Sequence, residues 1–240
     1  AQFDVLTNLL NRKTFESNLS ECLLESGKAN KRVALHFLDL DFFKAINDNF
    51  GHAFGDELLK QFSARLKENL RPGDIAARFG GDEFVIAQTG LDSIEDLADA
   101  TRKLYGNMIL PLQIMGKNLI PSVSMGTAMY PENGIDTSIL LHCADIALYV
   151  VKGQGRNGHR FFEPSYNQAR LRRTDLEFLV RKNVVSRNFE LAYQPYYSLK
   201  TGRLEGFEAL LRMRDTHGNF VSPAEFVPVA EDLGLISEIG

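Results

Sequence analysis

The chain has 240 residues, of which 44% are hydrophobic and 24% charged, a composition typical of globular rather than disordered proteins. Its formal charge of −4 argues against a general nucleic-acid binder or a membrane-surface protein, because both usually carry excess positive charge. No apolar run approaches the roughly 20 residues that a membrane-spanning helix needs.

Hydrophobic periodicity predicts ten elements in the first two thirds of the chain. In chain order we expect a helix at 6–24, a buried strand at 32–40, a short helix at 42–50, a helix at 56–70, strands at 74–79 and 83–88, a helix at 91–110, a strand at 119–130, a helix at 137–151 and a strand at 158–162. Gly80-Gly81 fits a hairpin turn between the second and third strands. This order predicts an α+β fold, a mixed sheet with helices on one face.

The pattern restarts after Glu163-Pro164, so we predict a first domain over 1–163 and a second over 164–240. The second domain is expected to contain a helix at 171–185 and strands at 190–193 and 203–211. The two cysteines, Cys22 and Cys143, lie in apolar helical patterns, which favours buried thiols in a reducing, cytoplasmic compartment. Because the chain begins with Ala1 and not Met, we expect it to be a piece of a longer protein.

Acidic residues gather at the end of the first strand and in the hairpin. Asp39 and Asp41 are two residues apart, which places them on one face of a strand, and Asp82 and Glu83 follow the glycine pair. Carboxylates that converge repel one another unless a cation lies between them, and Mg²⁺ prefers such oxygen ligands. The alternative is that both aspartates cap the next helix and that the glycine pair is only a turn.

Basic residues lie where they could serve a phosphate. Lys44 is in the first turn of the helix after Asp41, where the backbone N–H groups of Phe42 and Phe43 would also face an anion. Lys152 and Arg156 are four residues apart near a helix end, so they could share a face. The alternative for this last pair is a solvated helix end that complements the helix dipole.

Five sequence blocks in this order resemble the GGDEF family, the diguanylate cyclases, over residues 1 to about 163. The blocks are Asp4-Val5-Leu6-Thr7-Asn8-Leu9-Leu10-Asn11-Arg12, Leu38-Asp39-Leu40-Asp41-Phe42-Phe43-Lys44 with Asn47, Gly51-His52 and Gly55-Asp56, Gly80-Gly81-Asp82-Glu83-Phe84, Ser124-Met125-Gly126, and Ala144-Asp145-Ile146-Ala147-Leu148-Tyr149 with Lys152 and Arg156. Asn8 replaces the usual glycine of the first block, a small departure because Asn tolerates left-handed backbone.

The resemblance implies a ferredoxin-like, nucleotide-cyclase-like fold with a central mixed, mainly antiparallel sheet flanked by helices. It implies a Mg²⁺-dependent (or Mn²⁺-dependent) enzyme that condenses two GTP into cyclic di-GMP with release of two pyrophosphates. Because each GTP-loaded domain supplies half of a symmetric product, it also implies a homodimer for catalysis. The expected ligands are therefore GTP and cyclic di-GMP, with no nucleic acid, and any membrane anchor would lie outside this chain.

The resemblance also assigns roles to single residues. Asp39, the carbonyl of Leu40 and Asp82 would hold the metal ions, and Asp82 or Glu83 would help to activate the attacking 3′-hydroxyl. The residues expected to contact the phosphates are Phe42, Phe43, Lys44, Lys152 and Arg156, with Lys44 also counted among the catalytic residues. Those expected to read guanine are Asn47 and Asp56, with His52 nearby; the alternative for His52 is a packed or capping histidine.

A product-inhibition site is implied by Arg71 and Asp74, which form an Arg-x-x-Asp motif five residues before the Gly80-Gly81 pair. An arginine suits this role because its guanidinium binds phosphate or a guanine edge in a bidentate way. Arg102 lies where a second inhibitory arginine can fall. The alternative for Arg71 and Asp74 is a surface turn with a local ion pair.

Residues from about Thr174 resemble the start of an EAL domain, the cyclic di-GMP phosphodiesterase, with Met213 in place of the usual Trp. The resemblance implies that Glu208 is a metal ligand and that Gln194 and Arg212 contact the dinucleotide. A TIM-like barrel needs at least about 200 residues, so we expect an incomplete fragment, without phosphodiesterase activity, that is disordered, prone to aggregate or packed on a neighbour.

Three functions are weighed from the sequence. The first is an active diguanylate cyclase, favoured by the intact motif. The second is a catalytically silent domain that binds GTP or cyclic di-GMP and controls a downstream EAL phosphodiesterase. The third is a ferredoxin-like interaction domain without chemistry, which the acidic and basic clusters disfavour. The sensory input and the net output of a longer parent protein stay open.

Overall fold

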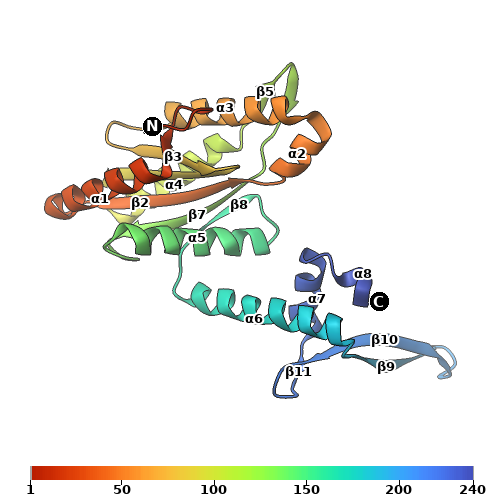
Figure 1. Ribbon diagram of the computed structural model, residues 1–240. Coiled ribbons are helices and arrows are strands. Elements are labelled where there is room, and N and C mark those ends of the chain that lie inside the picture. Colours follow the sequence, from red (N-terminus) through yellow and green to blue (C-terminus); the bar gives the residue numbers. More distant parts are fainter. Residues whose placement is uncertain (1, 240) are drawn as a thin grey trace. The chain divides into compact units, whose positions relative to one another are not determined.

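The computed structural model describes residues 2–239, which form two compact units that divide between Asn167 and Gln168. In the first unit, drawn in Figure 1, a six-stranded sheet has the strand order β1-β3-β4-β2-β7-β8. Its elements are β1 (Leu10–Asn11), α1 (Arg12–Ala29), β2 (Arg32–Leu40), α2 (Phe43–Phe50), α3 (His52–Glu68), β3 (Ile75–Gly80), β4 (Glu83–Leu91), α4 (Ile94–Met108), β5 (Leu112–Ile114), β6 (Lys117–Leu119), β7 (Val123–Tyr130), α5 (Thr137–Gly153) and β8 (Gly158–Phe161).

Strand β2 lies in the middle of this mixed sheet. It pairs antiparallel with β4 on one side and with β7 on the other, whereas the outer pairs β1–β3 and β7–β8 are parallel. The expected α+β fold with a mixed, mainly antiparallel sheet is therefore confirmed. A central strand is buried on both faces, which explains why β2 is apolar almost throughout.

Helices cover both faces of the sheet, so the expectation of helices on one face is wrong. Phe84 and Ile86 of β4 belong to one core with α3 and α4, while Val85 and Ala87 belong to the opposite core with α1 and α5. Alternate strand residues point to opposite faces, and both sets are apolar here. A strand with apolar side chains on both faces must be covered by two layers. One of these layers contains α5, which lies beside the carboxyl end of β2.

The first helix begins later than the sequence pattern predicts. Asn8 adopts a left-handed backbone conformation (φ 52°), and the Asn11 side chain caps α1 by accepting a hydrogen bond from the backbone N–H of Thr14 (3.0 Å). The helix continues through Gly27 to a left-handed cap at Asn30. The N-terminal apolar residues thus pack from a turn and not from a helix. Of the two expected buried thiols, Cys143 is buried and Cys22 is half-buried.

Two further differences concern turns. The hairpin of β5 and β6 was not expected; Met115 and Gly116, both with positive φ, form its two-residue turn. Helix α3 begins at His52 and not at residue 56, because Gly51 (φ 85°) reverses the chain directly after α2. Ser93 caps α4: its side chain accepts from the backbone N–H of Asp96 (3.0 Å).

The second unit consists of α6 (Ser165–Ser186, which spans the division), β9 (Phe189–Tyr197), β10 (Leu204–Arg214), β11 (Phe220–Val221), α7 (Pro223–Asp232) and α8 (Ile236–Ile239). One end of its three-stranded sheet, β11-β10-β9, packs against the helices. The side chains of Val180, Phe226 and Ala230 are fully buried there. The segment therefore has a small core of its own. Among the helices described in both units, none combines the length and apolarity needed to cross a membrane.

Candidate functional site

Negative charge is concentrated where β2 ends beside the β3–β4 hairpin. Asp39 lies directly opposite Glu83 in the β2–β4 register, and the backbone N–H of Leu40 donates to the carbonyl of Asp82 at 3.2 Å. Positive φ at Gly80 (153°) and Gly81 (50°) lets the hairpin turn this tightly. The fold therefore brings together the three predicted metal-binding residues and Glu83, from segments more than 40 positions apart.

The electrostatics of this cluster favour a cation. Burial raises the pKa of Asp39, and the charges of Asp82 and Asp41 raise it further, although Lys152 opposes both effects. Burial also raises the pKa of Glu83, followed by repulsion from Asp39. A carboxylate that is desolvated and repelled is stabilised by any nearby positive charge. Lys152 supplies part of it: its Nζ lies 2.6 Å from Asp39 Oδ2.

The basic residues predicted to hold phosphates lie beside this cluster. Lys152 is in the last turn of α5, and Arg156 follows in the loop before β8, with its guanidinium 5.4 Å from the ring centroid of Phe42. Phe42 has φ 61° and precedes α2, so the first amide groups of that helix, including those of Phe43 and Lys44, lack partners within the helix. The site thus combines backbone N–H groups with cationic side chains.

The residues predicted to read guanine lie at the junction of α2 and α3. The Oδ1 atom of Asn47 is buried without a hydrogen-bond partner among the described residues, and it rests against Gly55 so closely that a Cβ there would lie 1.9 Å from it. Asp56, the next residue, is exposed, as is His52 one turn earlier on the same helix. The structure therefore places Asn47 against Gly55, the residue before Asp56, and leaves both Asp56 and His52 exposed to solvent.

Asp41, which the sequence grouped with Asp39, has a different environment. Its carboxylate accepts hydrogen bonds from the hydroxyls of Ser122 and Ser124 (2.8 Å each) and from the backbone N–H of Asn157 (3.1 Å). It is 3% exposed. Both oxygens are therefore occupied by neutral donors, and Asp41 links the end of β2 to β7 and to the loop before β8.

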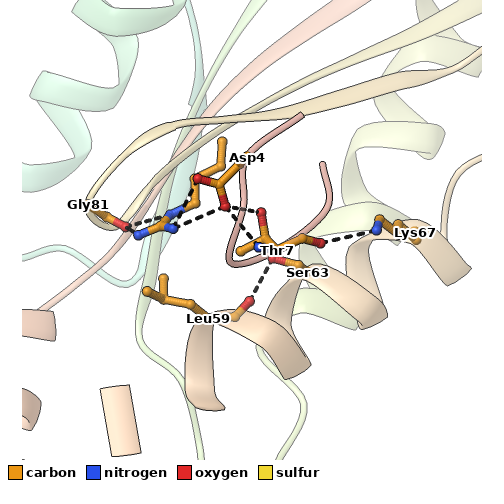
Figure 2. Close-up of polar contacts among 7 residues, drawn as sticks. Asp4, Thr7, Leu59, Ser63, Lys67 and Gly81 are labelled. Carbon is orange, nitrogen blue, oxygen red and sulfur yellow. Dashed lines mark hydrogen bonds and ion pairs between the residues drawn. The ribbon is translucent and has the colours of Figure 1, made fainter. Parts of the chain in front are cut away.

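The hairpin is also tied to the N-terminal turn. Figure 2 shows the carboxylate of Asp4 accepting from the backbone and side chain of Thr7 (2.9 and 2.6 Å). The guanidinium of Arg78 joins Asp4 (3.2 Å) to the carbonyl of Gly81 (2.7 Å), and Lys67 donates to the carbonyl of Thr7 (3.1 Å). Burial raises the pKa of Asp4, but the bonds from Thr7 and Arg78 outweigh it, so the pKa lies below its ordinary value.

The Arg71 and Asp74 motif forms a tight turn. Asp74 accepts from the backbone N–H groups of Arg71 and Thr89 (2.9 Å each), and burial raises its pKa. Arg71 lines a groove of about 310 Å³ together with Lys103 of α4. Arg102 does not line this groove; it pairs with Asp99 at 2.7 Å and is largely exposed.

In the second unit, Gln194 and Glu208 are directly opposite each other in the β9–β10 register. Arg212 lies on the same face of β10 as Glu208, four residues along the strand. The opposite face carries Met213 of the small core. The three residues that the EAL resemblance singles out therefore share the sheet face that points away from that core.

Divalent metal chemistry fits the first unit's donor set. Within residues 2–239, no group of three or more His, Cys, Asp or Glu side chains is arranged to hold a metal ion. Mg²⁺, however, is usually held by one or two carboxylates, with waters and substrate phosphates as its other ligands. Asp39 and Asp82, with the carbonyl of Leu40, are a set of this kind, and a cation would relieve the repulsion between the two carboxylates.

Sequence reasoning missed the contributions of Ser122, Ser124 and Gly55. The serines face Asp41 from more than 80 positions away, a pairing that no local pattern signals. Gly55 was quoted only as part of a motif, whereas its lack of a side chain makes room for Asn47. A glycine inside an otherwise regular helical pattern is the signal that could have indicated close packing there.

Comparisons with known proteins identify the family of each unit. The family described as diguanylate cyclase, GGDEF domain, matches residues 1–158, and the EAL domain family matches residues 179–240. The bifunctional diguanylate cyclase/cyclic di-GMP phosphodiesterase MucR of Pseudomonas aeruginosa is 38% identical over 240 residues, which cover 100% of this chain and 35% of MucR. The chain spans about a third of the length of the curated relatives it matches.

Solved structures give the same assignment. The GGDEF domain of TpbB, also called YfiN, from Pseudomonas aeruginosa superposes with a TM-score of 0.66 at 36% identity, covering 70% of this chain and 98% of that one. The GGDEF domain of DgcB from Caulobacter crescentus, in complex with cyclic di-GMP, gives 0.60 at 28% identity over 67% of this chain and 95% of that one. This chain therefore belongs to the GGDEF family of diguanylate cyclase domains and continues into part of an EAL domain.

Proposed function

We propose that the first unit is an active diguanylate cyclase, which joins two GTP molecules into cyclic di-GMP and releases two pyrophosphates. The observation that carries this proposal is the meeting of Asp39, Leu40 and the Asp82 turn beside Lys152. An interaction module would have no use for mutually repelling carboxylates gathered around the buried Asp39, with a lysine paired to it. The intact Gly80-Gly81-Asp82-Glu83-Phe84 run supports the same reading.

We assign the substrate contacts to two parts of the site, one for the guanine base and one for the triphosphate. Asn47 and Asp56 receive the guanine edge, where the Asp56 carboxylate accepts N–H groups that adenine does not offer on that edge. Lys44, Lys152 and Arg156 neutralise the triphosphate, and the amides of Phe42 and Phe43 hold one of its oxygens. His52 borders the base at the rim. This division places the α-phosphate next to the carboxylates.

In the bond-forming step, the 3′-oxygen of one GTP attacks the α-phosphorus of another, and the bond to the pyrophosphate oxygen breaks. Asp39, Asp82 and the Leu40 carbonyl would hold Mg²⁺ or Mn²⁺, which when bound lowers the pKa of the hydroxyl and neutralises the leaving charge. Glu83 or Asp82 accepts the hydroxyl proton. The raised pKa of Glu83 suits it to this role, because a base works best with a pKa near the operating pH.

Two GTP-loaded first units must face each other, since each supplies one half of a symmetric product. We therefore infer a homodimer during turnover, with the rate dependent on protein concentration. Arg71 and Asp74, with Arg102 on α4, are proposed to bind cyclic di-GMP as an inhibitor. The second unit is proposed to lack phosphodiesterase activity by itself, because Gln194, Glu208 and Arg212 are only part of a barrel site.

The test is incubation of the full chain with GTP and Mg²⁺, followed by chromatography of cyclic di-GMP and an assay of pyrophosphate. Both products are expected, with a rate that rises more than linearly with protein concentration. Asp82→Ala is expected to lower the rate by at least about 100-fold, the loss typical of removing one charge-stabilising group. Product formation that is unchanged in Asp82→Ala would contradict the assigned site.

A silent GTP-binding regulator is the second candidate. It is favoured by the names of some relatives, since NbdA of Pseudomonas aeruginosa, 34% identical over 239 residues, is described as a cyclic di-GMP phosphodiesterase. In the same assay, GTP binding without turnover in the parent chain would select this function. Absence of binding would reject both candidates and leave an interaction domain.

A further inference from the structure

The carboxylate of Asp41 joins three segments whose relative positions must be fixed for the proposed reaction. It follows β2 directly and is held by three neutral donors: the hydroxyls of Ser122 and Ser124 at the start of β7, and the backbone N–H of Asn157 in the loop between α5 and β8. The backbone N–H of Asp41 also donates to the carbonyl of Ser122 (2.9 Å). These three bonds occupy three of the roughly four lone-pair sites of this buried carboxylate, and all three donors are neutral.

The loop that Asp41 holds has an unfavourable backbone. Gly155, Arg156 and Asn157 have φ values of 106°, 64° and 45°, so two residues with side chains lie consecutively in the left-handed region. Such residues persist only where their surroundings fix them. Two hydrogen bonds do so here: Arg156 N–H donates to the carbonyl of Val151 (3.0 Å), and Asn157 N–H donates to Asp41.

The same loop carries a phosphate contact of the proposed reaction. Arg156 lies over the ring of Phe42, at the start of α2, and Lys152 lies one helical turn earlier on Asp39. A shift of the loop would move the guanidinium away from the triphosphate without touching Asn47 or Asp56, which belong to α2 and α3. Small misplacements of substrate-positioning groups have large effects on rate.

We propose that Asp41 is a positioning residue for the triphosphate, which acts through Asn157 to hold Arg156 and contacts neither metal nor substrate. The inference rests on the proposed function, since it assumes that GTP occupies this site. The sequence analysis grouped Asp41 with Asp39 among the converging carboxylates and gave it no role of its own. The serines Ser122 and Ser124 become part of the same positioning unit.

The experiment compares two ligands on the full chain, an α,β-methylene analogue of GTP that cannot release pyrophosphate, and guanosine, which has no phosphate. Dissociation constants are measured with Mg²⁺ by calorimetry and by ligand-observed NMR. In Asp41→Asn, affinity for the analogue is expected to fall about tenfold, the effect of one lost hydrogen bond to a charged group, while affinity for guanosine stays within about twofold. A variant that is merely destabilised would lose both ligands together.

Matched variants keep the proposal falsifiable if Asp41→Asn does not fold. Ser122→Ala removes one hydroxyl from Asp41 and is expected to weaken analogue binding several-fold, whereas Ser122→Thr keeps the hydroxyl and should match the parent chain. Asp136 caps α5, and its carboxylate accepts a hydrogen bond from the backbone N–H of Ile139 at 2.9 Å. Asp136→Ala removes this cap and therefore controls for a loss of stability in α5, the helix that precedes the loop. It is expected to leave the ratio of the two affinities unchanged.

Three results would overturn the proposal. Equal analogue binding by the parent, Asp41→Asn and Ser122→Ala would refute positioning while leaving the proposed function intact. A raised Mg²⁺ requirement in Asp41→Asn, with Ser122→Ala like the parent, would make Asp41 a metal ligand instead. A parent chain that binds guanosine but not the analogue would refute the proposed function, and the positioning role with it.

Discussion

The two units of this chain differ in how their sheets are covered. In the first, β2 and β4 are buried on both faces by helices of the same unit. In the second, one face of the β9–β10 hairpin is covered at the Met213 end, while Tyr193 and Phe207 on the same face are 63% and 58% exposed. The sequence patterns differ in the same way: β4 has four consecutive apolar residues at 84–87, whereas β9 and β10 interleave polar and charged residues.

This difference carries over to function. The first unit holds Asp39 and Asp41 against a complete core, where Lys152 pairs with Asp39 and neutral donors hold Asp41. The second presents Gln194, Glu208 and Arg212 on a three-stranded sheet with large exposed apolar side chains, a surface that needs a partner. A site requires rigid support on several sides, and only the first unit provides it within the described residues.

The largest expected effect is a loss of stability when a buried ring is removed from either core, and it should affect only that core. Phe62→Ala in the first unit and Phe226→Ala in the second each remove a fully buried ring and should each cost about 3–5 kcal/mol of unfolding free energy. Calorimetry should show two transitions, with each variant lowering only its own. Phe178→Ala, at a position 64% exposed, is the control and should change little. A single transition shifted by both core variants would mean that the units unfold together.

Acid should weaken the first unit through His36. Its ring is fully buried between Thr127 and Gln88 (2.9 and 3.0 Å), and burial lowers its pKa from 6.5 to about 4. The unfolded chain binds this proton at higher pH than the folded one, so stability is lost as pH falls from about 6.5 to about 4, by about 3 kcal/mol in total.

Urea unfolding at several pH values, for the parent and for His36→Gln, checks this expectation. Between pH about 6.5 and about 4, the unfolding free energy of His36→Gln should fall by about 3 kcal/mol less than that of the parent chain, whatever the absolute stability of the variant. Two parallel curves would show that His36 does not titrate differently on folding.

Two helical glycines of the first unit should respond in opposite directions. Gly55→Ala places a methyl group 1.9 Å from Asn47 Oδ1, so it should cost about 1–3 kcal/mol and weaken GTP binding by about tenfold or more. Gly106→Ala meets no atom within 4 Å and should stabilise the chain by about 0.4–1 kcal/mol with GTP binding unchanged. Thermal unfolding and GTP titration measure both; equal GTP affinity in the two variants would remove the role of Gly55 in placing Asn47.

The smallest expected effect on stability is at the exposed part of the sheet face that carries Met213. Tyr193→Ser should change the unfolding free energy by no more than about 0.5 kcal/mol, because the side chain is already largely exposed. It should nevertheless reduce self-association in sedimentation velocity and binding of a hydrophobic dye. A stability loss of several kcal/mol would show that this face is covered in solution.

The sequence pattern alone was sufficient to identify groups of residues that lie within a few positions of one another. Asp39, Leu40 and the Asp82 turn are each recognisable within a few residues, and the strand and hairpin that carry them are strongly periodic. The start of α1 was missed, because Asn8 and Asn11 redirect a chain whose apolar spacing still looks helical. The β5–β6 hairpin was missed because its strands are only three residues long.

By itself, the sequence determined the α+β class, the central apolar strand and the acidic and basic residues at its end, since these depend on side-chain type and short spacing. Only the tertiary structure decided that helices cover both faces, that Asp41 is occupied by Ser122, Ser124 and Asn157, and that Asn47 rests on Gly55. The physical reason is that a carboxylate's role depends on which donors surround it. Those donors come from segments that only the packed sheet brings within hydrogen-bond distance.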